Sequence, residues 1–152
     1  FTKIPTPQNP VIAFNTITTN HDYAVNGYVV KAIPVDHTVP AVGYVVSRGK
    51  VKLAYTGDTG PTEEFWKHVS GVDALIAEVS FPDSMGELAL LTKHLTSSLL
   101  RQELLKIGTL PARILITHPK PQYYDVIRQE IARMGLPGIE LLHDGAVFNF
   151  DH

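Results

Sequence analysis

The first half of the chain alternates short runs of β-branched and aromatic residues with Asn, Gly and Pro. Runs of this kind, bounded by turn-forming residues, are typical of β-strands. The segment Ser47-Arg48-Gly49-Lys50 separates two of the runs and predicts a hairpin turn. The pattern predicts strands at residues 11–18, 28–35, 41–46 and 51–56.

The pattern changes after Asp58, where segments of helical period alternate with short apolar runs. Pro61 suits the first position of a helix, and Gly71 would end that helix. Strands first, then alternating strands and helices, indicate a layered α/β domain that spans residues 1–152. Further helices are predicted at residues 96–107 and 122–134, and further strands at residues 73–80, 113–118, 139–143 and 146–150.

Composition narrows the chemistry that this domain can carry. The chain has no cysteine and seven histidines, so any metal must be held by His, Asp and Glu. The net charge is −2 and the basic residues are scattered, so we expect no nucleic-acid partner. No apolar run is long enough to cross a bilayer, so we expect no membrane partner and a cytoplasmic location. The chain begins without Met, and we therefore expect it to be a processed or excerpted piece.

Polar side chains follow four of the predicted strands at the point where each strand ends. His37, Asp58, Glu78 and His118 occupy these positions, whereas His94 precedes a predicted helix. Each residue alone has an ordinary structural explanation, such as a turn, a helix cap or a strand end. In α/β sheets, however, ligand-binding groups gather beyond the carboxyl ends of the strands. Taken together, the five residues predict a site at one edge of the sheet.

The residue types at this predicted site suit a metal-dependent hydrolase. Two histidines and an aspartate without sulfur are suitable ligands for zinc, manganese or iron, and Asp58 could bridge two ions. A carboxylate beside an imidazole fixes its tautomer and favours the protonated ring, so Glu78 and His94 form a candidate general acid. Lys120 offers a positive charge to an anionic substrate. His68 and His143 are assigned ordinary core or surface roles.

The ordered motifs "HTVPAVGYVV", "TGDTGP", "AEVSFPD", "KHLT", "ITHPKP" and "LHDGAVFNF" resemble the C-terminal half of the metallo-β-lactamase superfamily. Within it, the chain looks most like the class II 3′,5′-cyclic-nucleotide phosphodiesterases. The resemblance implies an αββα sandwich, of which this chain is about one half, a mixed sheet with flanking helices. It also implies two divalent metal ions, with zinc first and manganese or iron as alternatives. Asp58 and His118 would be metal ligands, and His94 and Glu78 the proton donor pair. His37 would be a catalytic contact to the substrate or transition state, with a metal ligand as the alternative.

The superfamily's His-x-His-x-Asp-His motif, which supplies most of the metal ligands, is absent from this sequence. The resemblance therefore implies a metal-dependent phosphodiesterase that acts on a small phosphodiester such as cyclic AMP only when complete, and an inactive isolated chain. It also implies that the chain self-associates or binds a missing N-terminal half. Two alternatives stay open: another hydrolase of the superfamily such as a tRNase Z-like nuclease, and a non-catalytic interaction domain.

Overall fold

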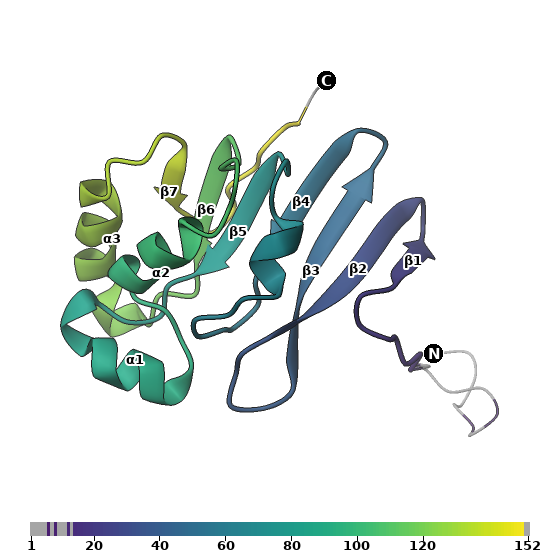
Figure 1. Cartoon of the computed structure of the whole chain (residues 1–152), viewed down its shortest axis with the longest axis horizontal. Coiled ribbons are helices and arrows are strands. Elements are labelled where there is room, and N and C mark those ends of the chain that lie inside the picture. The colour runs from purple at the N-terminus through teal and green to yellow at the C-terminus, as the bar shows by residue number, and fades with distance from the viewer. Residues whose placement is uncertain (1–5, 7, 9–11, 13, 151–152) are drawn as a thin grey trace.

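The fold is built on one mixed sheet of seven strands, which follow one another in space in the order of the chain (Figure 1). The computed structural model describes residues 6, 8, 12 and 14–150. Strands β1 to β4 pair antiparallel, and β4 to β7 pair parallel. The strands are β1 (Asp22–Val25), β2 (Tyr28–Val35), β3 (Ala41–Arg48), β4 (Val51–Tyr55), β5 (Ala74–Glu78), β6 (Arg113–Thr117) and β7 (Ile139–Leu141).

Three α-helices and three 3-10 helices connect the parallel strands. They are η1 (Phe65–His68), η2 (Asp83–Met85), α1 (Gly86–Thr92), α2 (Ser97–Leu104), η3 (Pro121–Tyr123) and α3 (Tyr124–Arg133). Thr96 caps α2, because its side chain accepts a hydrogen bond from the backbone N–H of Leu99. None of the helices in the described part of the chain is both long and apolar enough to cross a bilayer.

The core lies on one face of the sheet, where the helices pack. Alternate strand residues such as Ala54, Leu75 and Ile114 lie in register on this face and are buried. Phe65 and Trp66 of η1, together with apolar residues of α2 and α3, complete the same cluster. The opposite face differs, since Val30, Val46 and Leu53 are only half-buried there and Tyr55 is exposed. The sheet therefore has one covered face and one partly open face.

The predicted strands and helices are confirmed in most of the chain, but several segments differ, among them β1, which lies where no strand was predicted. Within the strand predicted at residues 11–18, Ile12 and residues 14–18 form no strand and Phe14 is almost fully exposed, while residues 11 and 13 lie outside the described part of the chain. Residues 146–150 also form no strand. The helix predicted from Pro61 shrinks to the four residues of η1, while α1 lies in a segment where no helix was predicted.

The sheet topology determines where the residues of the predicted site lie. Strands β4, β5 and β6 are parallel, so their carboxyl ends meet at one edge. Strand β2 is related to β4 by two antiparallel pairings and therefore ends at this edge as well. The last residue of β5, the segments that follow β2, β4 and β6, and the connection between α1 and α2 carry the five residues predicted to form a site.

Candidate metal and catalytic site

Glu78 and His94 form the buried centre of the site. Glu78 ends β5 and is fully buried, and its Oε1 lies 2.7 Å from Nδ1 of His94. The backbone N–H of Thr59 also donates to Oε1, at 3.0 Å. A buried carboxylate is costly unless it is paired and hydrogen-bonded, and here both conditions are met. The pairing of Glu78 with His94 that the sequence predicted is therefore present in the fold.

Ser80, which the sequence analysis did not single out, joins this pair to His118. Its hydroxyl donates to Oε2 of Glu78 at 2.7 Å and lies 2.8 Å from Nδ1 of His118. Because the hydroxyl proton goes to Glu78, its oxygen accepts the proton on Nδ1 of His118. The same oxygen lies 3.2 Å from Nδ1 of His94. One buried hydroxyl thus contacts a carboxylate and two imidazoles.

His37 is oriented by a backbone carbonyl from the connection between α1 and α2. Its Nδ1 lies 3.0 Å from the carbonyl oxygen of Lys93, so Nδ1 carries the proton. Lys93 adopts a left-handed conformation, with φ of 54°, and its ammonium pairs with Asp36. A Cβ on Gly60 would lie 3.1 Å from the Cα of Lys93, so the turn after β4 packs closely on this connection. These contacts hold His37 and His94 side by side, with ring centroids 5.0 Å apart.

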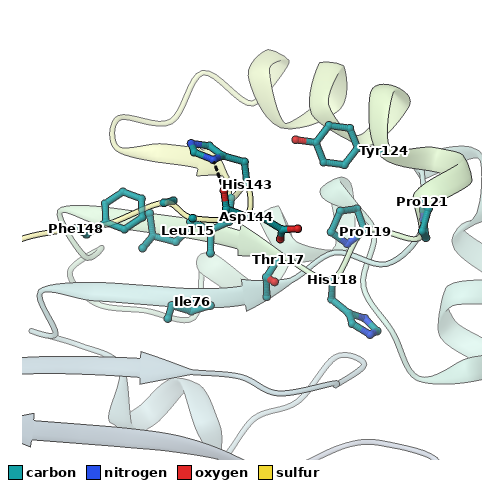
Figure 2. Close-up of a pocket in the computed structure, with 13 residues that line it drawn as sticks. Ile76, Leu115, Thr117, His118, Pro119, Pro121, Tyr124, His143, Asp144 and Phe148 are labelled. Atoms are coloured by element: carbon teal, nitrogen blue, oxygen red, sulfur yellow. Dashed lines mark hydrogen bonds between the residues drawn. The ribbon is translucent and has the colours of Figure 1, made fainter.

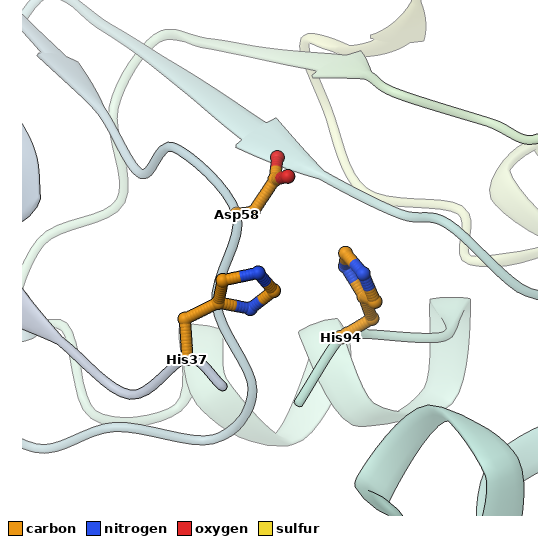
Figure 3. Close-up of side chains that lie close together, drawn as sticks. All are labelled: His37, Asp58 and His94. Carbon is orange, nitrogen blue, oxygen red and sulfur yellow. The ribbon is translucent and has the colours of Figure 1, made fainter. Parts of the chain in front are cut away.

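Asp58 and His118 lie at the open side of the site. The Asp58 side chain is 38% exposed, and its Oδ1 lies 3.7 Å from Nδ1 of His118. His118 has φ of 67°, an uncommon conformation for a residue with a side chain and one that often marks a functional position. Its ring stacks on His94 with centroids 5.7 Å apart. Figure 3 shows that the side chains of Asp58, His37 and His94 lie close together.

The donor atoms suit a divalent metal. Two groups have ligand atoms within 4.8 Å of one another: His37, Asp58 and His94, and Glu78, His94 and His118. Metal-binding histidines almost always donate the proton of their other ring nitrogen to a fixed acceptor. The three histidines follow this rule through Nδ1, which donates to a carbonyl, a carboxylate and a hydroxyl respectively. Each ring therefore presents Nε2 as the atom for a metal or a proton.

Two further side chains lie close to the pair of Glu78 and His94. The Lys120 ammonium lies over the Phe81 ring, 4.9 Å from its centroid, and Phe81 packs edge-on against His94. Burial and the charges of Asp58 and Glu78 raise the pKa of the Tyr55 phenol above its usual 10.0. Tyr55 therefore remains a hydrogen-bond donor throughout the physiological pH range.

Residues 2–118 match the family described as beta-lactamase superfamily domain. The chain belongs to this superfamily. Its fold is also that of the metallo-β-lactamase-fold protein YhfI from Bacillus subtilis, with a TM-score of 0.76 at 18% identity. That likeness covers 88% of this chain and 54% of YhfI. The predicted fold, a mixed sheet with flanking helices, is thus confirmed as part of a metallo-β-lactamase fold.

Two relatives in this superfamily carry the name ribonuclease Z. Ribonuclease Z 1 of Schizosaccharomyces pombe is 36% identical over 72 residues, which are 47% of this chain and 9% of that protein. Ribonuclease Z of Pyrobaculum calidifontis is 37% identical over 76 residues, or 50% of this chain and 24% of that protein. The matched segments span less than a quarter of either relative. These names do not support the predicted relationship to cyclic-nucleotide phosphodiesterases, and they favour the tRNase Z-like alternative.

Superfamily members are metal-dependent hydrolases that typically hold two divalent metals, and the histidine and carboxylate donors of this chain are compatible with that chemistry.

The position of Ser80 could have been found from sequence. Residues two apart in an extended chain point to the same side, so Ser80 follows Glu78 on one side of the segment. The role of Lys93 left no such signal, because it acts through its backbone carbonyl.

Proposed function

We propose that this chain is part of a metal-dependent hydrolase that cleaves phosphodiester bonds in RNA. The observation that carries the proposal is the buried pair of Glu78 and His94 beside the open cluster of His37 and Asp58. A carboxylate-held imidazole next to metal ligands combines a proton donor with a site that binds phosphoryl oxygens. The names of the two relatives support RNA as the substrate class.

Each side chain has a distinct task in this proposal. Asp58 and His118 would hold metal through a carboxylate oxygen and an imidazole nitrogen, and zinc would be the first candidate ion. When bound, divalent metals supply Lewis acidity and lower the pKa of a coordinated water toward neutrality. His94 delivers a proton from Nε2 to the leaving oxygen, while Glu78 stabilises the ring through Nδ1. His37 and Lys120 contact the phosphoryl group and reduce its negative charge.

The ligand set is completed by a segment that this chain does not contain. The chain spans about half the length of YhfI and less of the two ribonuclease Z relatives. The partly open sheet face carries half-buried Val30, Val46 and Leu53, which suits packing against a second layer. We therefore expect the isolated chain to bind metal weakly and to lack activity. An N-terminal half or a second copy of the chain would cover this face.

The proposed substrate is therefore RNA and not a cyclic nucleotide. Nucleic acid becomes an expected partner, in contrast to the expectation from the sequence. That expectation rested on the net charge of −2. Net charge describes the average field of this chain, whereas phosphate contacts require only a local positive surface, which the rest of the protein can supply.

A substrate panel tests the proposal in the full-length, zinc-loaded protein. We expect hydrolysis of RNA and little hydrolysis of cyclic AMP. Asp58→Ala should lose metal and activity together, measured by elemental analysis and turnover. His94→Gln should keep metal and lose activity. Asp125→Ala, at an exposed position of α3, is the matched control. Cleavage of cyclic AMP in preference to RNA would overturn the substrate assignment, and full activity in both site variants would overturn the mechanism.

A further inference from the structure

The backbone of Lys120 is fixed beside the site by its two neighbours and by a hydrogen bond. Lys120 stands between Pro119 and Pro121 in an extended conformation, with φ of −64° and ψ of 132°, and its N–H donates to the carbonyl of Ser80 at 3.3 Å. Both prolines line a cavity on the partly open sheet face, which Phe148 also lines, whereas Lys120 does not (Figure 2). Neighbours in an extended segment point to opposite sides. The Lys120 side chain therefore lies outside the face that a second layer would cover.

Phe81 gives the Lys120 ammonium a fixed neighbour. Phe81 is only 5% exposed, and its N–H donates to the carbonyl of Leu95 at 3.4 Å. Its ring packs edge-on against His94, with centroids 5.8 Å apart, and lies 6.3 Å from the Tyr123 ring. The Lys120 ammonium lies 4.9 Å from the Phe81 centroid, within the distance at which an aromatic face attracts a cation. One buried ring therefore contacts both the proposed proton donor and the proposed phosphate-binding cation.

The Phe81 ring orients this ammonium without cancelling its charge. The ammonium groups of Lys93 and Lys106 pair with carboxylates, so their charges are largely balanced. None of the ion pairs between described residues includes Lys120. An aromatic ring attracts a cation through its quadrupole and carries no net charge. The full positive charge of Lys120 is therefore available to an anion that binds at the site.

We propose that Phe81 is a positioning residue of the phosphate site, which holds the Lys120 ammonium in place to bind a phosphate oxygen beside His94. A lysine side chain that moved freely would have to be ordered when phosphate binds, and this entropy cost would weaken binding. The contribution of Lys120 to phosphate affinity should therefore depend on the Phe81 ring. The inference rests on the proposed function, because it takes a phosphate group to bind at this site.

Binding of inorganic phosphate to the full-length, zinc-loaded protein tests the proposal, because it requires no proton transfer from His94. By titration calorimetry, Lys120→Met should weaken phosphate about 10-fold. Phe81→Leu should weaken it about 3- to 10-fold in the unaltered protein and add no further loss in the Lys120→Met protein. Phe65→Leu is the matched control, since the Phe65 ring is also buried but packs on Trp66 in the core, and it should leave phosphate affinity unchanged.

A second variant keeps the test informative if Phe81→Leu disturbs the fold. A phenylalanine analogue with fluorinated ring carbons, incorporated in place of Phe81, nearly keeps the shape of the ring but reduces the negative charge of its face. It should weaken phosphate in the unaltered protein and have no effect in the Lys120→Met protein.

Three outcomes decide the matter. Unchanged affinity with the fluorinated ring, or losses from Phe81→Leu and Lys120→Met that simply add, would overturn the positioning role even if RNA is hydrolysed. Conversely, a protein that shows the expected coupling but hydrolyses no phosphodiester would keep the positioning role and overturn the proposed function.

Discussion

Glu78 and Glu103 are two buried carboxylates of this fold, and their partners differ. Glu103 in α2 accepts hydrogen bonds from the Trp66 indole and the Thr62 backbone, and it pairs with the Lys106 ammonium. Glu78 accepts from a backbone N–H as well, but its other partners are a serine hydroxyl and an imidazole. Both side chains are almost completely buried.

The comparison teaches that burial alone does not identify a functional carboxylate. The donors around Glu103 are an indole, a peptide and an ammonium, which keep their protons at physiological pH, so this residue ties η1 to α2. The partner of Glu78 is instead an imidazole, which can both donate and accept a proton, and the other ring nitrogen of His94 faces an open cluster of ligands. One carboxylate therefore serves stability, and the other is placed for chemistry.

The largest effect that separates the two residues is expected in turnover. Glu78→Gln removes the negative charge that stabilises a protonated His94, so we expect turnover of the full-length protein to fall by about 10²- to 10⁴-fold. Metal content, measured by elemental analysis, should remain because Asp58 and His118 are unchanged. Glu103→Gln should leave turnover within about threefold of the unaltered protein, since small shifts far from a site have small effects. Equal losses of turnover in the two variants would remove the functional distinction between them.

A smaller effect is expected for Ser80, which contacts Glu78 and two histidines. Ser80→Ala leaves the buried oxygen Oε2 of Glu78 and the Nδ1 proton of His118 without this partner. We expect metal affinity to fall by about 10- to 100-fold, as is usual for residues that orient metal ligands. Ser80→Thr keeps the hydroxyl and should restore most of the affinity, as measured by competition with a zinc chelator. Equal zinc affinities of the alanine and threonine variants would contradict the role of the hydroxyl.

Much of the fold could be predicted because strands and turns leave a local pattern. The hairpin at Ser47–Lys50 and the parallel strands of the second half are confirmed. Residues 146–150 carry the same alternation of apolar residues, but Phe148 packs over the sheet as a cavity wall rather than pairing at its edge. Side-chain alternation cannot tell these outcomes apart, because it reports burial and not backbone pairing. The helix predicted from Pro61 is likewise shorter than expected, since only Phe65–His68 form a 3-10 helix.

The residues of the site that lie at strand ends could be predicted from the sequence. Glu78 and His94 were expected to pair, and they do, because β5 ends where the connection between α1 and α2 passes. The positions of Asp58, His37 and His118 were expected at the same edge, and the parallel strands bring them there. Ser80 could have been placed beside Glu78 by its spacing of two residues, whereas Lys93 acts through its backbone carbonyl, which residue type does not reveal.

A substitution of Glu103 tests the other half of the comparison, namely that this carboxylate supports the stability of the fold. Glu103→Gln removes one acceptor from a set of three donors, so we expect a loss of about 1–3 kcal/mol in the free energy of unfolding. The matched control is Glu63→Gln, because Glu63 pairs with the same Lys106 ammonium but its side chain is 78% exposed. That substitution should change stability far less, since exposed ion pairs contribute little. Urea denaturation followed by tryptophan fluorescence measures both, and equal losses would show that burial around Glu103 is unimportant.

The smallest expected effect is a pH dependence of stability, which Lys106 contributes through its pairs with Glu103 and Glu63. Burial of its ammonium acts to lower the pKa, but hydrogen bonds and charge interactions with Glu103 and Glu63 outweigh it and raise the pKa above 10.5. A raised pKa in the folded state stabilises the protein below pH 10.5, and this contribution disappears as the pH rises through the folded value. Lys106→Met should therefore lower stability by about 1 kcal/mol at pH 8 and by progressively less above pH 10.5. Lys67→Met, which breaks only the exposed pair with Glu64, should produce no measurable change. A loss from Lys106→Met that stays constant with pH would mean that its apolar stem, and not its charge, supports Glu103.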